Sequence, residues 1–126
     1  MKASKGLSKI PELALRQRRQ GLVQLLPPAG EVLRGSLVER YVTCGNSSCK
    51  CGRGERHGPV WYLSVTLGPG RTTGGVVPAE QVEQVRRWIG NYQQVKRALE
   101  KISEINRELL RRQQSALRAR KRKKGA

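Results

Sequence analysis

Aspartate and phenylalanine are both absent from the 126 residues, and histidine and methionine occur once each. Enzymes that hold Mg²⁺ usually use several converging carboxylates. Here all nine acidic residues are Glu, and most lie on predicted helix faces where ion pairs or the helix dipole account for them. Glu39 and Glu55 are the only conceivable general bases, and neither has a second carboxylate nearby in sequence. The sequence therefore disfavours an enzyme.

Aromatic residues are also scarce, with two Trp and three Tyr in a chain whose apolar fraction is 37%. Such a composition limits the core to roughly residues 20–95, so a bound metal would help to stabilise it. No apolar stretch is long enough to span a membrane, and charges interrupt the first 26 residues. We therefore expect no transmembrane segment and no signal peptide, and a cytoplasmic or nucleoid-associated location.

All three cysteines and the only histidine lie close together in the run CGNSSCKCGRGERH. Cys44, Cys49, Cys51 and His57 are four ligands of the kind that a tetrahedral zinc site uses. The spacing lacks the C-x-x-C pairs of most structural zinc sites. An odd number of cysteines disfavours a disulfide, and a catalytic zinc would need an open position and a nearby base. Structural Zn²⁺ is the prediction, with buried or reactive thiols, or a disulfide, as alternatives.

Positive charge is concentrated at the two ends of the chain. The 26 Lys and Arg against nine Glu give a net charge of +17. Residues 1–20 carry +5, residues 111–126 carry +8, and the ninety residues between them carry only +4. Neutralising phosphates with such charge releases counterions, so we expect nucleic acid, DNA or RNA, as the partner. The alternative is a pair of solubilising ends without a partner.

A membrane surface is a weaker candidate partner, because Leu117 is the only large apolar residue after Arg111. Basic side chains in the cysteine loop, after the second strand and near the C-terminus are expected to contact phosphates. Tyr62 is expected to stack on unpaired bases, whereas Trp61 belongs to an apolar alternation and is expected in the core. The predicted nucleic-acid contacts are Lys50, Arg53, Arg56, Tyr62, Arg71, Arg111, Arg112, Arg118, Arg120, Lys121, Arg122, Lys123 and Lys124.

The pattern of elements predicts an α+β fold: an N-terminal helix, a small three-stranded antiparallel β unit that is zinc-ribbon-like, and a long C-terminal helix with a basic tail. The first helix is expected over residues 11–26, because Pro27 and Pro28 end it. The predicted organisation is a flexible basic N-terminus, one small domain and a basic tail, at residues 1–9, 10–110 and 111–126.

The β unit is expected over residues 36–77, with the cysteine loop joining its first two strands. Residues 60–67 alternate apolar and polar side chains, as a half-buried strand does. The Gly–Pro–Gly run at residues 68–70 predicts a hairpin turn into a third strand. Gly74 and Gly75 indicate a bulge or weak pairing in that strand.

One long helix is predicted over residues 79–117, because apolar residues recur at three- and four-residue steps from Val82 to Leu109. Pro78 suits its first turn. A helix of this length extends beyond a small β unit, so its distal half needs a partner of its own. Either the N-terminal helix folds back on it, or a second copy joins it in a short or irregular coiled coil. The alternative is an ordinary core helix with a frayed basic end.

Two runs of the chain combine several motifs: RGSLVERYVTCGNSSCKCGRGERHGPVWYLSVTLG and VVPAEQVEQVRRWIGNYQQVKRALEKISEINRELL. They hold a strand that starts with RGS, a Cys–Cys–Cys–HGP loop, an aromatic strand, a VP helix start and W-x-x-x-Y. This combination, over residues 34 to about 110, resembles a family of small bacterial and archaeal proteins of uncharacterised function. The residues that match its pattern are Cys44, Cys49, Cys51, His57, Gly58, Pro59, Trp88 and Tyr92.

Members of that family are sometimes found beside mobile-element genes, so the resemblance implies an accessory role in such an element. This chain departs from the family pattern in its third strand, TTGGVV, and at Val60, where an aromatic residue is usual.

Two functions follow from these observations. The first is a non-enzymatic nucleic-acid-binding protein, in which zinc braces a β-finger and the basic ends bind phosphates. The alternative is a structural or accessory subunit of a larger nucleoprotein or recombinase complex, which docks a protein partner or a second copy through the helix at 79–117.

Overall fold

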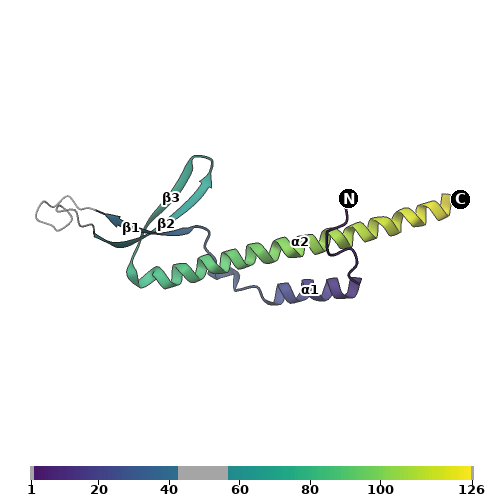
Figure 1. The fold of residues 1–126 in the computed structure, drawn as a ribbon, viewed down its shortest axis with the longest axis horizontal. Coiled ribbons are helices and arrows are strands. Elements are labelled where there is room, and N and C mark those ends of the chain that lie inside the picture. The colour runs from purple at the N-terminus through teal and green to yellow at the C-terminus, as the bar shows by residue number, and fades with distance from the viewer. Residues whose placement is uncertain (1, 43–56, 126) are drawn as a thin grey trace, which may run out of the picture. The chain divides into compact units, whose positions relative to one another are not determined.

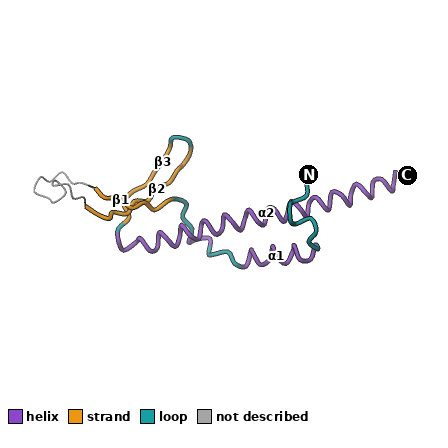
Figure 2. Tube along the Cα trace, in the orientation of Figure 1, coloured by secondary structure: helices purple, strands orange, loops and turns teal. Residues whose placement is uncertain are grey.

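The computed structural model describes residues 2–42 and 57–125. Its elements follow the order helix, three strands, helix, which confirms the predicted α+β fold class (Figures 1 and 2). They are α1 (Glu12–Gln24), the 3-10 helix η1 (Ala29–Glu31), β1 (Ser36–Val42), β2 (His57–Gly68), β3 (Arg71–Val77), the 3-10 helix η3 (Ala79–Gln81) and α2 (Val82–Gly125).

The chain divides into two compact units, which we name the helical unit and the sheet unit. The helical unit comprises the chain up to Pro27 and from Gln94 onward, and the sheet unit runs from Pro28 to Gln93. The sheet unit is therefore inserted, along the sequence, between the two parts of the helical unit. Helix α2 supplies its first turns to the sheet unit and its remaining turns to the helical unit.

The sheet is antiparallel, in the order β1–β2–β3, with β2 in the centre. The predicted hairpin turn joins β2 to β3, and Gly70 adopts a φ of 68° there, which a residue without a Cβ tolerates. Of the two expectations for Gly74 and Gly75, a bulge or weak pairing, the structure excludes the bulge. The β2–β3 register is regular across this position and shifts between Thr66 and Gly68. A Cβ on Gly74 would collide with the carbonyl oxygen of Leu63, so glycine is needed for close strand approach.

Adjacent residues of β3 show which face of the sheet is covered. Val77 is 7% exposed and pairs with Trp61, whereas Val76 is 65% exposed and pairs with Tyr62. Successive strand residues point to opposite faces, so Trp61 and Tyr62 lie on opposite faces. The Arg86 guanidinium lies 4.7 Å from the Trp61 ring centroid, so the first turns of α2 cover the Trp61 face.

In the helical unit, α1 packs against α2. Leu15 is fully buried and forms a cluster with Ile105 and Leu109, and the partly buried residues around it are Leu7, Ile10 and Leu22. The N-terminal helix thus provides the partner that the distal half of the long helix needs. Figure 1 shows α1 alongside this part of α2.

The long helix begins and ends later than the predicted 79–117, because residues 79–81 form η3 and α2 continues to Gly125. No glycine or proline interrupts the chain between Leu117 and Gly125. Three cations lie in the last turn, where the negative end of the helix dipole favours them. The basic residues near the C-terminus are therefore displayed on a helix.

Candidate nucleic-acid interface

The last turns of α2 form the most strongly charged surface of the described structure. Residues 115–125 are all exposed and helical, and they contain no acidic side chain. Arg118 and Lys124 bound a run in which six of seven residues are cationic. The predicted contacts that the structure places together on this surface are Arg118, Arg120, Lys121, Arg122, Lys123 and Lys124.

Charge is divided unequally between the two units. The helical unit contains 18 Lys and Arg and four Glu, which gives a net charge of +14. The sheet unit contains eight Lys and Arg and five Glu, which gives +3. Most of the excess positive charge of this protein therefore belongs to the helical unit.

Arg111 and Arg112, also predicted to contact nucleic acid, are engaged inside the helical unit. Arg111 donates to Glu108 through Nε at 2.9 Å and Nη2 at 2.8 Å, and Arg112 Nε donates to Glu108 Oε2 at 2.6 Å. Both arginine side chains are only 25% exposed. Their placement in contact with nucleic acid stays a prediction, and the structure gives them an intramolecular role.

Arg112 also holds the segment that precedes α1. Its Nη2 donates to the carbonyl oxygens of Leu7, Ser8 and Ile10 at 3.0, 3.3 and 2.6 Å. The backbone N–H of Ser4 donates to Glu108 Oε1 at 3.4 Å. We name Glu108, Arg111 and Arg112 the ion cluster, which ties the N-terminal segment to α2.

The Glu108 carboxylate is the anionic centre of this cluster, and its side chain is fully buried. Hydrogen bonds from Arg111, together with those from Arg112 and the Ser4 backbone, lower the pKa of Glu108 to about 2 against the opposing effect of burial. A buried carboxylate with these partners stays ionised at neutral pH. The spacing of Glu108 and Arg112 predicts an ordinary pair on the exposed side of a helix. The pair is present, but the burial of Glu108 and the contacts of the cluster with the N-terminal segment were not predicted.

The open face of the sheet offers a second, weaker candidate surface. The Arg40 guanidinium lies 4.3 Å from the centroid of the Tyr62 ring, and Val38 and Val76 are exposed on the same face. A planar cation on an aromatic ring is a surface on which a base can stack. Arg71, another predicted contact, is exposed at the start of β3. Sequence reasoning missed Arg40, because only the register of β1 on β2 brings it to Tyr62.

The predicted zinc ligands Cys44, Cys49 and Cys51 lie outside the described residues, as do Lys50, Arg53 and Arg56. The loop that contains them connects neighbouring antiparallel strands, and its flanking residues Val42 and His57 are paired in the ladder. Among residues 2–42 and 57–125, no group of three or more Cys, His, Asp or Glu side chains could hold a metal ion. The zinc site therefore stays a prediction.

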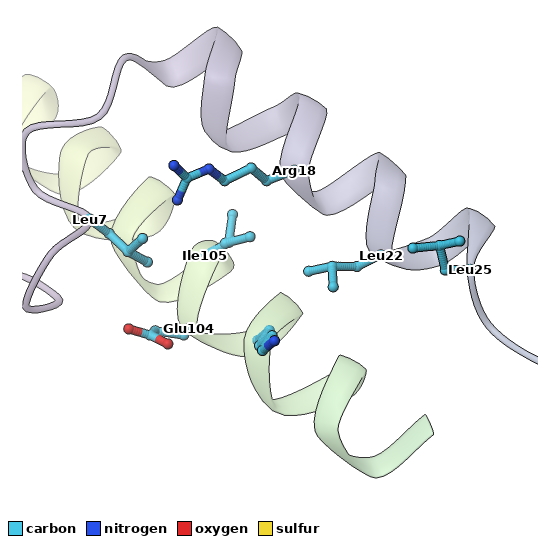
Figure 3. Close-up of a pocket in the computed structure, with 7 residues that line it drawn as sticks. Leu7, Arg18, Leu22, Leu25, Glu104 and Ile105 are labelled. Carbon is cyan, nitrogen blue, oxygen red and sulfur yellow. The ribbon is translucent and has the colours of Figure 1, made fainter. Parts of the chain in front are cut away.

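A groove of about 480 Å³ lies in the helical unit between α1, α2 and the N-terminal segment. Figure 3 shows Arg18 and Leu22 from α1, with Leu25 just after this helix, on one side of the groove, and Glu104 and Ile105 from α2 opposite. Leu25 is 73% exposed, the highest value among the large apolar side chains of the described residues. The residues that line the groove are Leu7, Arg18, Leu22, Leu25, Lys101, Glu104 and Ile105.

These features define a small α+β protein in which a cationic helix end extends from a core formed with α1. Residues 12–87 match the family model described as Domain of unknown function (DUF6788), so the chain belongs to this family. The predicted membership of an uncharacterised family is confirmed. The match includes α1, all three strands and the cysteine loop, and it ends before the cationic turns of α2.

Comparison with curated proteins finds no match, and comparison with solved structures finds none either. Among the described residues, neither helix combines the length and the apolar character that crossing a bilayer demands.

Proposed function

We propose that this protein is a non-enzymatic nucleic-acid-binding protein of the cytoplasm, whose helical unit provides most of the contacts to phosphates. The observation that supports this most directly is the run from Arg118 to Lys124, in which six exposed cations share two turns of helix. Counterion release from a polyanion makes such a surface bind with an affinity that depends strongly on salt.

A nucleic acid fits this surface better than an anionic membrane does. Membrane-binding helices bury an apolar face, and the last turns of α2 have a single large apolar residue, Leu117. The Arg40–Tyr62 pair adds a place where an unpaired base could stack. That site is in the sheet unit, so it would add to the phosphate contacts rather than replace them.

We further propose that the cysteine loop binds one structural Zn²⁺ through Cys44, Cys49, Cys51 and His57. The ladder supports this proposal, because Val42 and His57 are paired and Cys44 is only two residues from Val42 along the chain. Four soft or borderline ligands on one short loop suit a closed tetrahedral site. Such a site would brace the end of the β1–β2 hairpin without any catalytic role.

The test of nucleic-acid binding is a salt series with fluorescent duplex DNA, single-stranded DNA and structured RNA. We compare the wild type with a triple variant, Arg118→Gln, Arg120→Gln and Arg122→Gln. The variant should bind more weakly. The slope of log K against log salt concentration should become less steep by up to about three, since each lost phosphate contact removes roughly 0.9 from its magnitude.

The control triple variant changes Lys96, Arg97 and Arg107 to Gln. These exposed cations lie on the same helix, and their substitution removes the same amount of positive charge. We expect a smaller loss of affinity from it. Equal losses in the two variants would contradict a binding surface at the end of α2. Absence of binding to all three nucleic acids at low salt would overturn the proposed function, as would tighter binding to anionic vesicles.

The alternative function, a docking subunit of a larger nucleoprotein complex, is favoured by the groove in the helical unit. Its apolar residues include Leu25, which can be changed to Lys without disturbing the buried Leu15 cluster. Ile105 is unsuitable for such a test because it is 4% exposed and belongs to the core. If Leu25→Lys abolished a protein association but left nucleic-acid binding intact, docking would be a separate activity.

A further inference from the structure

We propose that residues 115–125 bind as an intact helix in the major groove of B-form DNA, where their cations contact phosphates of both strands. This inference rests on the proposed function and goes further, because it names the form of nucleic acid and the way it is bound. It predicts that the helix, and not only its charge, determines affinity.

The exposed part of α2 is long enough to lie across the major groove of DNA. Residues 115–125 are exposed throughout, and the last buried residue of the helix is Leu109. Within the described part of the chain, no hydrogen bond or ion pair joins any side chain from Arg118 to Lys124 to another residue. At 1.5 Å per residue, the exposed segment is roughly 16 Å long, somewhat more than the 12 Å width of the major groove.

The cations of this segment surround the helix instead of lying on one side. With about 100° between successive residues, the six side chains from Arg118 to Lys124 leave no sector wider than roughly 100° without a positive charge. A flat anionic surface, or one edge of a strand, would neutralise only the side that faces it. When a helix lies in a groove of a duplex, phosphates along both walls can contact cations on opposite sides of the helix.

The dimensions of nucleic-acid grooves select B-form DNA. The major groove of B-DNA admits an α-helix, whose overall diameter is about 10–12 Å. The major groove of A-form RNA is deep and narrow, so it excludes such a helix. Single strands have no groove. We therefore expect duplex DNA to bind more tightly than duplex RNA or single-stranded DNA of equal phosphate number.

The experiment uses the full chain and a variant that breaks the helix without changing charge. Ala119 lies among the cations inside α2. Proline there removes a backbone hydrogen bond and clashes with the preceding turn, while all six cations remain. Ala119→Gln is the matched control, because it replaces the same alanine with a neutral residue that is a good helix former. Binding to duplex DNA, duplex RNA and single-stranded DNA is measured at one fixed salt concentration.

We expect Ala119→Pro to bind duplex DNA about tenfold more weakly than the wild type and to lose its preference for the duplex, since the broken segment no longer fits the groove. Ala119→Gln should bind as the wild type does. A second readout is methylation by dimethyl sulfate, which attacks guanine N7 in the major groove and adenine N3 in the minor groove. The bound wild type should protect guanine N7 and leave adenine N3 reactive.

Unchanged duplex binding by Ala119→Pro would overturn the inference and leave the proposed function intact, because an extended polycation would then suffice. Protection of adenine N3 alone would overturn it as well, in favour of the minor groove. If the wild type bound no nucleic acid at all, the proposed function itself would fail. Tighter binding to duplex RNA than to duplex DNA would contradict the groove argument specifically.

Discussion

The helical unit and the sheet unit are stabilised by different kinds of interaction and carry different chemistry. All five aromatic residues, all three cysteines and the histidine lie in the sheet unit, which has a net charge of only +3. The helical unit has no aromatic residue, carries +14 and depends on a few aliphatic side chains and one buried carboxylate. The possible metal ligands and stacking rings thus belong to one unit, and most of the positive charge belongs to the other.

This separation makes each unit accessible to its own spectroscopic probe. Trp61 and Trp88 are the only tryptophans, and both lie in the sheet unit, so tryptophan fluorescence reports on that unit. Far-UV circular dichroism is dominated by α1 and α2. A change that acts on one unit should move one signal and leave the other largely unchanged.

The largest effect should come from removing the metal that we propose for the cysteine loop. Cys49→Ser, or a strong chelator, should destabilise the sheet unit severely, because structural zinc binding can supply on the order of 10 kcal/mol to a small domain. Tryptophan fluorescence should then change at temperatures where the helical signal persists. Metal analysis should give one zinc per wild-type chain. A chain that contains no zinc and is indifferent to chelator would contradict the site.

The ion cluster is the corresponding point at which to destabilise the helical unit. Glu108→Gln leaves Arg111 and Arg112 without their buried counter-charge, which should cost about 3 kcal/mol, the low end for such a loss because both arginines are partly exposed. Helical dichroism should melt earlier, while tryptophan fluorescence stays close to wild type. Glu100→Gln, an exposed glutamate on the same helix, is the control. Equal melting of both variants would show that the cluster contributes little.

Acid should weaken the helical unit through the same carboxylate, with a smaller effect at moderately low pH. The pKa of Glu108 is lowered from 4.5 to about 2 in the folded protein. A lowered pKa contributes stability that is complete above the unfolded value and is lost as pH falls from about 4.5 to about 2. The helical melting temperature of the wild type should fall across this window. The difference between wild type and Glu108→Gln should shrink with it, and a constant difference would contradict the assignment.

Local patterns predicted most of the fold. Alternation over residues 60–67, the Gly–Pro–Gly turn and the prolines after α1 are local signals, and each element they define is present. The predicted end of the long helix, residue 117, is too early, because the dense run of cations after it was interpreted as a basic tail beyond the helix. The helix dipole and the absence of a breaking residue favour helix there instead.

The candidate site was less accessible to sequence reasoning, because its contacts join distant parts of the chain. Arg112 meets the carbonyls of Leu7 and Ile10 only after α1 has packed on α2, so its sequence context resembles that of any exposed arginine. The Arg40–Tyr62 pair depends on strand register in the same way. Arg118 to Lys124, by contrast, were identified from composition alone, since their exposure follows from the lack of apolar neighbours.

The insertion of the sheet unit between the two parts of the helical unit has a consequence for synthesis on the ribosome. The sheet unit is complete in sequence by Gln93, whereas the ion cluster needs Arg112 to meet Leu7, more than a hundred residues earlier. Domains generally fold as their sequence emerges, so the sheet unit should fold first. Helix α1 can pack only after the distal half of α2 has been synthesised. The cationic turns of α2 follow α1 and the sheet unit along the sequence, so both are synthesised before this polycation.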